Sequence, residues 1–418
     1  MPLKPLPIGL LGLSVSNLTL PETVSEIQML IENYQKDLRP HYIATLNVDF
    51  IVNIHTINSS SIRFPELLKV LQHSSLVTLD GMPLVWLSRL LGSPFKERVT
   101  GIDLLPKIAE SLHRKNQSLF LLGGDEKTLK LCSIYLQADY PGLRMAGTSH
   151  PLIPIEGENL ETAEERDKLI VEHINRAAPD VLLLNLGNPK QEIWFERIRN
   201  KLHVPVTIGV GGAFNLLVGR VVRAPVWMQN LGLEWVFRLF QEPHRLFSRY
   251  IKDLIKFPLI ALPLVAYQTW KRVIYNLFYR PRKGLIKIRA PFLFISKQKT
   301  IAVVQLPVRV GDLAAAEILQ TLANLFSQDI VVLDFKKVKH IDLEGIALFL
   351  EINNTAEREK KQLHFLNLTP DIKLLFRLHR LREMVEAKAC HSPSALLERF
   401  IVNGSPTFLM PFNNFKTK

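Results

Sequence analysis

At 418 residues, the chain is longer than a single hydrophobic core usually supports, which favours at least two domains. Its composition of 47% apolar and 22% charged residues excludes an intrinsically disordered chain. The formal charge of +13 indicates an anionic partner. The chain has only two cysteines, Cys132 and Cys390, which excludes a disulfide framework or a thiolate metal cluster and suits a reducing cytoplasm.

The first half of the chain alternates predicted strands with predicted helices. Residues 1–18 lack the apolar core and cleavage site of a secretory signal, so we expect a first strand there. The segment Thr19–Glu22 resembles a capping box that opens a helix. Buried strands are then predicted at 42–52, 76–80, 118–124, 181–186 and 204–210, with amphipathic helices between them. This alternation predicts a parallel α/β sheet.

Loops that follow the predicted strands carry candidate ligand-binding residues. In parallel α/β sheets, ligands bind at the carboxyl ends of the strands. Four segments occupy such places: 45–47, 80–81, 123–124 and 187–192. We therefore expect the functional site at this edge of the sheet.

Asp80 follows a short apolar strand and precedes Gly81, which allows the backbone to turn sharply or to approach a ligand. A carboxylate in this place is suited to general-base catalysis. The alternative is structural, with Asp80 capping the helix that follows.

The segment Gly187–Glu192 combines a glycine, a proline and polar side chains at a predicted helix start. Helix N-termini suit phosphate groups and sugar hydroxyls, whereas the plainer alternative is a loop in which Gln191 is solvated. The glycines within 209–212 lack the spacing of a dinucleotide fingerprint, which disfavours a nicotinamide oxidoreductase.

Residues 238–283 form a basic segment with long apolar side chains, and they contain ten Lys and Arg residues against two acids.

The apolar run 257–267 is shorter than the stretch of about 20 residues that spans a bilayer core, and Pro258 and Pro263 are expected to weaken a continuous helix. We expect this run to lie in the interface of an anionic membrane, with an ordinary buried helix as the alternative. The aliphatic side chains between the basic residues disfavour a nucleic-acid partner.

A second α/β pattern begins after about residue 285. Its predicted strands and helices lie at 292–298, 300–307, 329–335, 342–362, 363–368 and 371–381, of which 342–362 and 371–381 are helical. This pattern predicts a second, smaller domain.

Eight motifs in the first part of the chain occur together in one known family. They are TLN at 45–47, DGMP at 80–83, ERVTGIDL at 97–104, FLLGG at 120–124, YPGL at 140–143, PDVLLLNLGNPKQEIW at 179–194, GVGGAFNLLVGRVVRAPVW at 209–227 and GLEWVFRLFQEPHR at 232–245. With these motifs in this order, residues 8–252 resemble the WecG/TagA/CpsF family of bacterial glycosyltransferases.

The resemblance implies a Rossmann-like domain that takes a UDP-activated sugar, typically N-acetylmannosamine or its uronic acid. It also implies transfer, with inversion, to an undecaprenyl-diphosphate-linked amino sugar. A single displacement of this kind needs a base for the acceptor hydroxyl and cations for the leaving diphosphate. Asp80 matches the base that is proposed for the family.

Further site residues follow from the same resemblance. Thr45, Asn47 and Gln191 align with polar family residues that line the sugar-nucleotide pocket. No Asp-x-Asp motif appears in a strand-end loop, and the family is thought to work without a bound divalent ion. We therefore expect no metal and no cofactor, with the UDP-sugar as substrate.

Arg238, Arg245 and Arg249 are similar to arginines that the family supplies to the diphosphate from a C-terminal appendage. Their spacings of seven and four residues predict that one helical face presents all three. The alternative is that they are solvated basic side chains on an amphipathic helix.

Residues 290–400 resemble a STAS domain, on the strand ending at Asp334, the turn HIDLEGIAL and the segment LNLTPDIKLLF. The resemblance implies a regulatory or partner-binding module. Where many members read Asp-Ser-Ser-Gly, Asp342–Gly345 reads Asp-Leu-Glu-Gly. Glu344 therefore places a fixed negative charge at a helix start, and it either mimics a phosphorylated serine or serves only as a helix cap.

The sequence thus predicts a Rossmann-like glycosyltransferase domain at 1–225, a basic membrane-contacting appendage and linker at 226–285, and a STAS-like domain at 286–405. We expect a peripheral enzyme on the cytoplasmic face of the cell membrane. The alternative is a non-catalytic scaffold that binds a sugar nucleotide and signals through the STAS-like domain. The presence of Asp80, Gln191 and the arginines of the appendage disfavours that alternative, because an idle site has no chemical need for them.

Overall fold

The computed structural model describes residues 6–57, 62–155, 163–278, 292–295, 300–311, 314–315, 317–318, 328–390 and 409–411. The chain forms two compact units, of which the first contains residues 16–86 and 95–259 and the second contains residues 1–15, 87–94 and 260–418. The division falls inside two helices, α4 (Met82–Leu91) and α12 (Pro243–Phe278). Residues 1–15 and 87–94 thus group with the C-terminal part of the chain.

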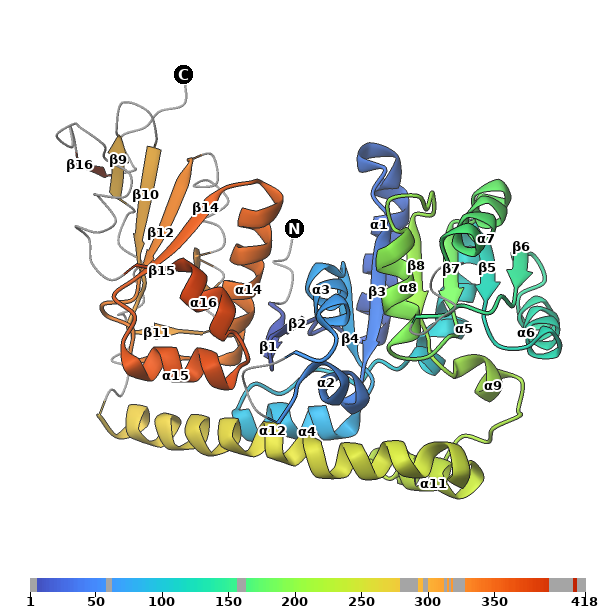
Figure 1. The fold of residues 1–418 in the computed structure, drawn as a ribbon. Helices are drawn as coiled ribbons and strands as arrows, with labels where there is room; N and C mark the ends of the chain where they lie inside the picture. The colour runs from blue at the N-terminus through green and yellow to red at the C-terminus, as the bar shows by residue number, and fades with distance from the viewer. Residues whose placement is uncertain are drawn as a thin grey trace. The chain divides into compact units, whose positions relative to one another are not determined.

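A six-stranded parallel sheet forms the centre of the first unit (Figure 1). In space its strands follow the order β4-β3-β8-β7-β5-β6. Their bounds are β3 His41–Leu46, β4 Leu76–Leu79, β5 Ser118–Leu122, β6 Arg144–Ser149, β7 Val181–Leu184 and β8 Val206–Gly209. All strands except the edge strand β6 are buried at every position, as expected for a sheet covered on both faces. The predicted α/β fold class is confirmed.

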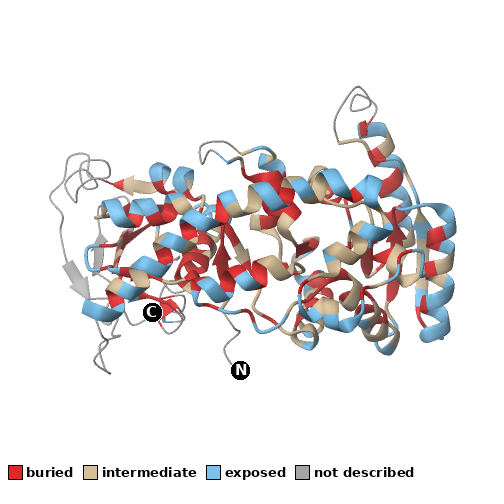
Figure 2. Cartoon of the chain, turned by 90° about the horizontal axis from the view of Figure 1, so that it is seen from below, coloured by how far each residue is buried: buried red, intermediate tan, exposed pale blue. Residues whose placement is uncertain are grey.

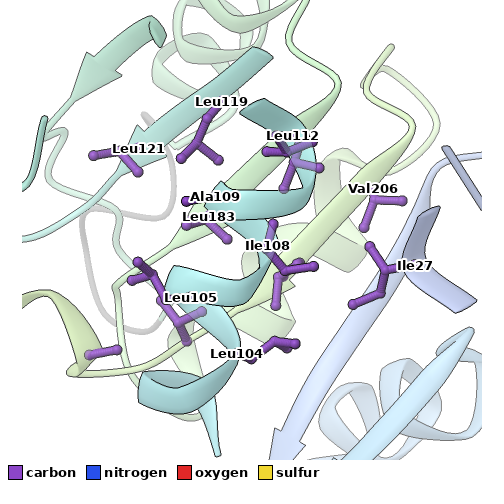
Figure 3. Packing of buried hydrophobic residues seen from close by; sticks show 14 of the residues in the cluster. Ile27, Leu104, Leu105, Ile108, Ala109, Leu112, Leu119, Leu121, Leu183 and Val206 are labelled. Atoms are coloured by element: carbon purple, nitrogen blue, oxygen red, sulfur yellow. The ribbon is translucent and has the colours of Figure 1, made fainter. Parts of the chain in front are cut away.

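Helices cover both faces of this sheet. On one face, α1 (Leu20–Asp37), α5 (Gly101–Arg114), α6 (Glu126–Asp139) and α9 (Ala213–Leu217) share a hydrophobic core with the strands. Figure 3 shows Ile108 and Leu112 of α5 in this core, together with Leu119 and Leu183 of the sheet. The other face is covered by α3 (Pro65–His73), α7 (Ala163–Ala177) and α8 (Lys190–Ile198). Buried residues lie mainly on the strands and the inner sides of the helices (Figure 2).

Two local predictions near the site had different outcomes. The capping box at Thr19 and Glu22 is confirmed, because both of its reciprocal hydrogen bonds are present at the start of α1. The strand predicted at 42–52 is wrong in its second half, where α2 (Val48–Ile54) follows β3 directly. The side chain of Asn47 caps α2 by accepting a hydrogen bond from the Asp49 N–H (3.1 Å), which overrides the apolar, β-prone composition of the segment.

The second unit contains another six-stranded sheet, in the order β15-β14-β12-β10-β9-β16. Strands β10 (Thr300–Gln305), β12 (Ile330–Asp334), β14 (Gln362–Leu366) and β15 (Ala389–Cys390) are parallel, whereas β9 (Phe292–Ile295) pairs antiparallel with β10 and with β16 (Leu409–Pro411). The short strands β11 (Arg309–Val310) and β13 (His340–Ile341) form a separate parallel pair. Its helices include α14 (Leu343–Arg358), α15 (Pro370–Leu378) and α16 (Arg382–Lys388). The predicted second α/β domain is confirmed.

An N-terminal hairpin, β1 (Ile8–Leu10) and β2 (Leu13–Val15), packs against α14 in the second unit. A Cβ atom on Gly9 would lie 2.6 Å from Ile346 Cγ2 and closer still to the Ala347 backbone nitrogen, so a residue without a side chain is needed here. The Ser14 hydroxyl donates a hydrogen bond to Glu351 Oε1 (2.8 Å). The expected N-terminal strand is therefore a short hairpin that completes the C-terminal domain.

Helix α12 continues through Pro258 and Pro263, so neither proline ends the helix. Each proline removes one backbone donor, but Ile260 and Leu264 are buried on one side of the helix and stabilise it by packing. Among the described residues, the structure contains no helix with the length and hydropathy needed to cross a membrane.

Candidate active site

Asp80 lies at the carboxyl end of β4, next to the end of β3. Its backbone N–H donates to the Leu46 carbonyl oxygen (2.8 Å), and its carboxylate accepts a hydrogen bond from the backbone N–H of Gly101, the first residue of α5. A Cβ atom on Gly101 would lie 3.0 Å from the Val210 carbonyl oxygen, so glycine allows the start of α5 to approach the end of β8 closely. The site therefore forms where two strand ends meet a helix N-terminus, an arrangement that favours an anion.

The Asp80 carboxyl group titrates near neutral pH. Burial, with a further contribution from Glu234, raises its pKa from 3.8 to about 7. Arg98, the Gly101 N–H and Arg238 act in the opposite direction. A carboxyl group whose pKa lies near the working pH is suited to accept a proton during a reaction, as a general base must.

Two arginines near Asp80 are held in place by acidic side chains. Arg98 Nη1 lies 3.1 Å from Glu234 Oε2, and both side chains are only 17% exposed. Arg223 Nη2 lies 3.0 Å from Asp103 Oδ2. These ion pairs hold guanidinium groups where the charge of a diphosphate can be bound.

The sequence did not assign roles to Arg98, Arg223 or Glu234. Arg98 lies inside the ERVTGIDL motif, but its partner Glu234 follows 136 residues later, so local sequence gives no signal for the pair. Among the residues that the structure describes, no three or more His, Cys, Asp or Glu side chains gather in a way that would hold a metal ion.

The three arginines of the appendage do not share one helical face, and this prediction is wrong. Helix α11 (Glu234–Gln241) has Glu242 as its C-cap residue, and α12 begins directly after it. Arg238, on α11, lies close enough to Asp80 to lower its pKa, and its guanidinium lies near the backbone of Gly212. Arg245, on α12, is exposed and donates from Nε to Glu242 Oε1 (2.8 Å).

Arg249 lies beside two buried acids instead of Asp80. Burial raises the pKa of Asp253 to about 7 and also raises that of Asp49, while Arg249 opposes both shifts. Nearby, Lys252 Nζ donates to Asn53 Oδ1 (2.7 Å). These groups connect the start of α12 to α2, so Arg238 is the appendage arginine that lies next to the candidate base.

The structure brings the other predicted pocket residues to the same edge of the sheet. Thr45 Oγ1 donates to the Gly209 carbonyl oxygen (2.9 Å), which ties the end of β3 to the end of β8. Asn47 caps α2 directly after β3. Gln191 is only 1% exposed, and its Oε1 accepts from the Gly211 N–H (3.3 Å), so the alternative of a solvated Gln191 is wrong.

In the second unit, the turn before α14 is bonded to its surroundings. Asp342 is the N-cap residue, and its carboxylate pairs with Arg309 Nε (2.8 Å) and His340 Nε2 (2.8 Å). Glu344, in the first helical turn, accepts a hydrogen bond from Ser93 Oγ (2.8 Å). A negative charge therefore does occupy the start of this helix, as both interpretations of Glu344 require.

Two family profiles match the chain. The profile of the Glycosyl transferase WecG/TagA/CpsF family matches residues 8–272, and the profile described as Mlab, STAS domain matches residues 295–386. The predicted two-part architecture is thereby confirmed.

Two relatives share the name N-acetylglucosaminyldiphosphoundecaprenol N-acetyl-beta-D-mannosaminyltransferase. The protein from Bacillus subtilis (strain 168) is 30% identical over 206 residues, which cover 49% of this chain and 74% of that protein. The protein from Staphylococcus aureus (strain MW2) is 28% identical over 239 residues, which cover 57% of this chain and 86% of that protein. Among solved structures, the anti-sigma factor antagonist SpoIIAA in its unphosphorylated form aligns over 27% of this chain and 100% of its own, at 19% identity and a TM-score of 0.23.

Proposed function

Because the chain belongs to the WecG/TagA/CpsF family of glycosyltransferases, we propose that it is an inverting enzyme that uses a UDP-sugar donor. The sugar is N-acetylmannosamine, its uronic acid or a related hexose, and the acceptor is an undecaprenyl-diphosphate-linked amino sugar. The names of the relatives support an acceptor of this kind. The product would enter bacterial polysaccharide or cell-wall glycan assembly.

The environment of Asp80 is the observation that carries this proposal. In a single displacement, the acceptor hydroxyl loses a proton as it attacks the anomeric carbon, and the diphosphate leaves with added negative charge. Asp80, with a pKa of about 7, accepts that proton. Arg98 and Arg238 lie beside it and stabilise the leaving diphosphate.

Donor binding is assigned to the strand ends around Asp80. Thr45 and Asn47 lie at the end of β3, and Gln191, in the first turn of α8, contacts the segment after β8; ligands bind at such strand ends in parallel α/β folds. Because arginines supply positive charge next to Asp80, we propose that transfer needs no divalent ion and no further cofactor. Arg249 and Arg245 then serve mainly to hold the appendage, through the charges around Asp49 and Glu242.

The outer face of α12 supports a peripheral place on the inner face of the cell membrane. Phe247, Ile251, Leu254, Ile255 and Leu259 are between 42% and 60% exposed and recur at helical spacing. The helix lies within the basic segment 238–283. An exposed apolar stripe with neighbouring cations fits an anionic bilayer surface, which would also present the lipid-linked acceptor.

The STAS-like domain is proposed as a regulatory or partner-binding module. Its α14 carries the N-terminal hairpin on one side and the Ser93–Glu344 hydrogen bond at its start. A protein partner would therefore bind another surface of the domain or displace these contacts.

Incubating the protein with UDP-N-acetylmannosamine and a short-chain lipid-diphosphate-GlcNAc tests the proposal. We expect UDP release that depends on the acceptor and persists in EDTA. Asp80→Asn should bind donor normally but lower the rate by about 100- to 10,000-fold, the usual contribution of a general base. UDP release without acceptor dependence, or full activity of Asp80→Asn, would contradict it. Donor binding by a wild-type protein that transfers no sugar would favour the scaffold alternative.

A further inference from the structure

Glu192 is a buried acid that the proposed chemistry does not use. It lies in the first turn of α8, beside Gln191, and its exposed fraction is 0%. Three neutral side chains donate hydrogen bonds to it: Tyr42 Oη (2.9 Å) and Gln191 Nε2 (2.7 Å) to Oε1, and Asn188 Nδ2 (3.5 Å) to Oε2. Burial raises the pKa of Glu192 to about 7, and the hydrogen bonds from Gln191 and Tyr42 oppose that rise. Burying an acid in this way is costly, so its contacts need an explanation.

The contacts of Gln191 set the direction of its side-chain amide. Its Oε1 accepts from the Gly211 N–H (3.3 Å), and its Nε2 donates to the Glu192 carboxylate (2.7 Å). In its ionised form a carboxylate only accepts hydrogen bonds, and a backbone N–H only donates them. Turning the amide over would set oxygen against oxygen at Glu192 and donor against donor at Gly211. The two ends of the amide are therefore fixed by different neighbours.

Gly209 lets this network reach the end of β8. A Cβ atom at Gly209 would lie 2.5 Å from Gln191 Nε2 and closer still to Tyr42 Oη, so both polar groups lie directly against the strand backbone. The carbonyl oxygen of the same glycine accepts the hydrogen bond from Thr45. Two of the predicted donor-pocket residues, Thr45 and Gln191, thus both lie against Gly209. An amide that uses one N–H and one lone pair in such contacts keeps the others for a ligand.

We propose that Glu192 is a positioning residue that fixes the direction of the Gln191 amide in the donor pocket. The inference rests on the proposed function, because that function assigns Gln191 to the donor. Glu192 acts through Gln191 and does not touch the substrate.

A double-mutant cycle separates this role from a merely structural one. Donor affinity is measured by titration calorimetry with UDP-N-acetylmannosamine in the absence of acceptor, and donor KM is measured in the transfer assay. Glu192→Met removes the acceptor and keeps a side chain of similar length, so we expect about three- to tenfold weaker donor binding, the effect of one misplaced hydrogen bond. In a Gln191→Ala background, the same substitution should cause no further loss, since the residue that it positions is gone.

The control is Glu196→Met on the same helix, where Glu196 pairs with Lys69 (2.9 Å), and it should leave donor affinity unchanged. Should Glu192→Met fail to fold, Glu192→Leu, which also removes the acceptor, replaces it in the cycle, with the same non-additivity expected. Additive losses in the cycle, or unchanged donor affinity in the folded Glu192 variants, overturn the inference while the proposed function stands. A wild-type protein that binds no UDP-sugar overturns the proposed function itself.

Discussion

At Asp80, burial and the charge of Glu234 raise the pKa of the carboxyl group, whereas Arg98 and Arg238 lower it, and burial is the largest of these effects. Because the pKa is raised to about 7, the carboxyl is mostly protonated, and unable to accept a proton, below that pH. We expect kcat/KM to fall about tenfold per pH unit below pH 7 and to level off above it, because kcat/KM reports the pKa of the free enzyme. Rates measured at donor concentrations well below KM between pH 5 and 9 check this. A profile that is flat through pH 7 would contradict Asp80 as the base.

Arg238 and Arg245 form a matched pair for testing the diphosphate contact. Arg238 lies near Asp80, whereas Arg245 is exposed and paired with Glu242. We expect Arg238→Ala to lower kcat/KM by roughly 100-fold, as removal of one preorganised cation or donor at a developing charge does. Arg245→Ala should change it by less than about threefold, because exposed ion pairs contribute little. Equal losses in the two variants would refute this assignment.

At the scale of elements, the contact between β1 and α14 depends on a glycine. A methyl group on Gly9 would collide with Ile346 and with the backbone at Ala347, which cannot move aside as the end of a flexible side chain can. We expect Gly9→Ala to destabilise the second unit by about 1–3 kcal/mol, the usual cost of overpacking. Denaturant unfolding measures the loss.

The control for that substitution is Gly212→Ala. The nearest atom to its added Cβ is an arginine side-chain nitrogen at 3.6 Å, which is an ordinary contact distance. This variant should unfold like the wild type. Comparable destabilisation by both substitutions would mean that the tight approach of Gly9 is not the cause.

Sequence predicted those elements whose signals are local. The capping box at Thr19 and the buried strands of the first sheet follow from residue spacing, and Asp80 lies at a strand end as expected. The helix after Asn47 was missed because its apolar residues also suit a strand, and a single cap decides between the two. The prediction that the three arginines share one helical face is wrong because α11 ends at Gln241 and a second helix, α12, starts at Pro243.

Long-range contacts account for what local sequence could not provide. Ser14 and Glu351 are 337 positions apart, and Ser93 and Glu344 are 251 positions apart. Neither pair carries a periodic or motif signal. The N-terminal hairpin and residues 87–94 therefore belong to the second unit, although they match the glycosyltransferase family in sequence.

For the molecule as a whole, buried acids set the pH dependence of stability. Burial raises the pKa of Asp80, Glu192 and Asp253 to about 7, so the folded first unit binds more protons than the unfolded chain between about pH 4 and 7. This stabilisation is present at low pH and is lost as the pH rises through 7.

We therefore expect the free energy of unfolding of the first unit to fall from pH 5 to pH 8. Glu192 accounts for up to about 3 kcal/mol of that fall, from a shift between 4.5 and about 7. In Glu192→Gln, which does not ionise, the fall should be smaller by that amount. Chemical denaturation at each pH provides the measurement, and identical slopes for the two proteins would contradict the pH effect of Glu192.

The net charge and the stripe of exposed apolar side chains on α12 together predict how the protein binds a membrane. The charge of +13 draws the protein to anionic lipid, and the exposed stripe adds apolar contact. We expect flotation with phosphatidylglycerol vesicles that weakens as salt rises from 0.1 to about 0.5 M, because salt screens the attraction.

Leu254→Asp, in the stripe, should weaken binding by about fivefold or more, since it replaces apolar contact with a charge. Leu169→Asp, at an exposed leucine on α7, should not. If both variants float like the wild type, or both lose binding equally, the α12 face is not the membrane contact, and the lipid-linked acceptor must reach Asp80 by another surface.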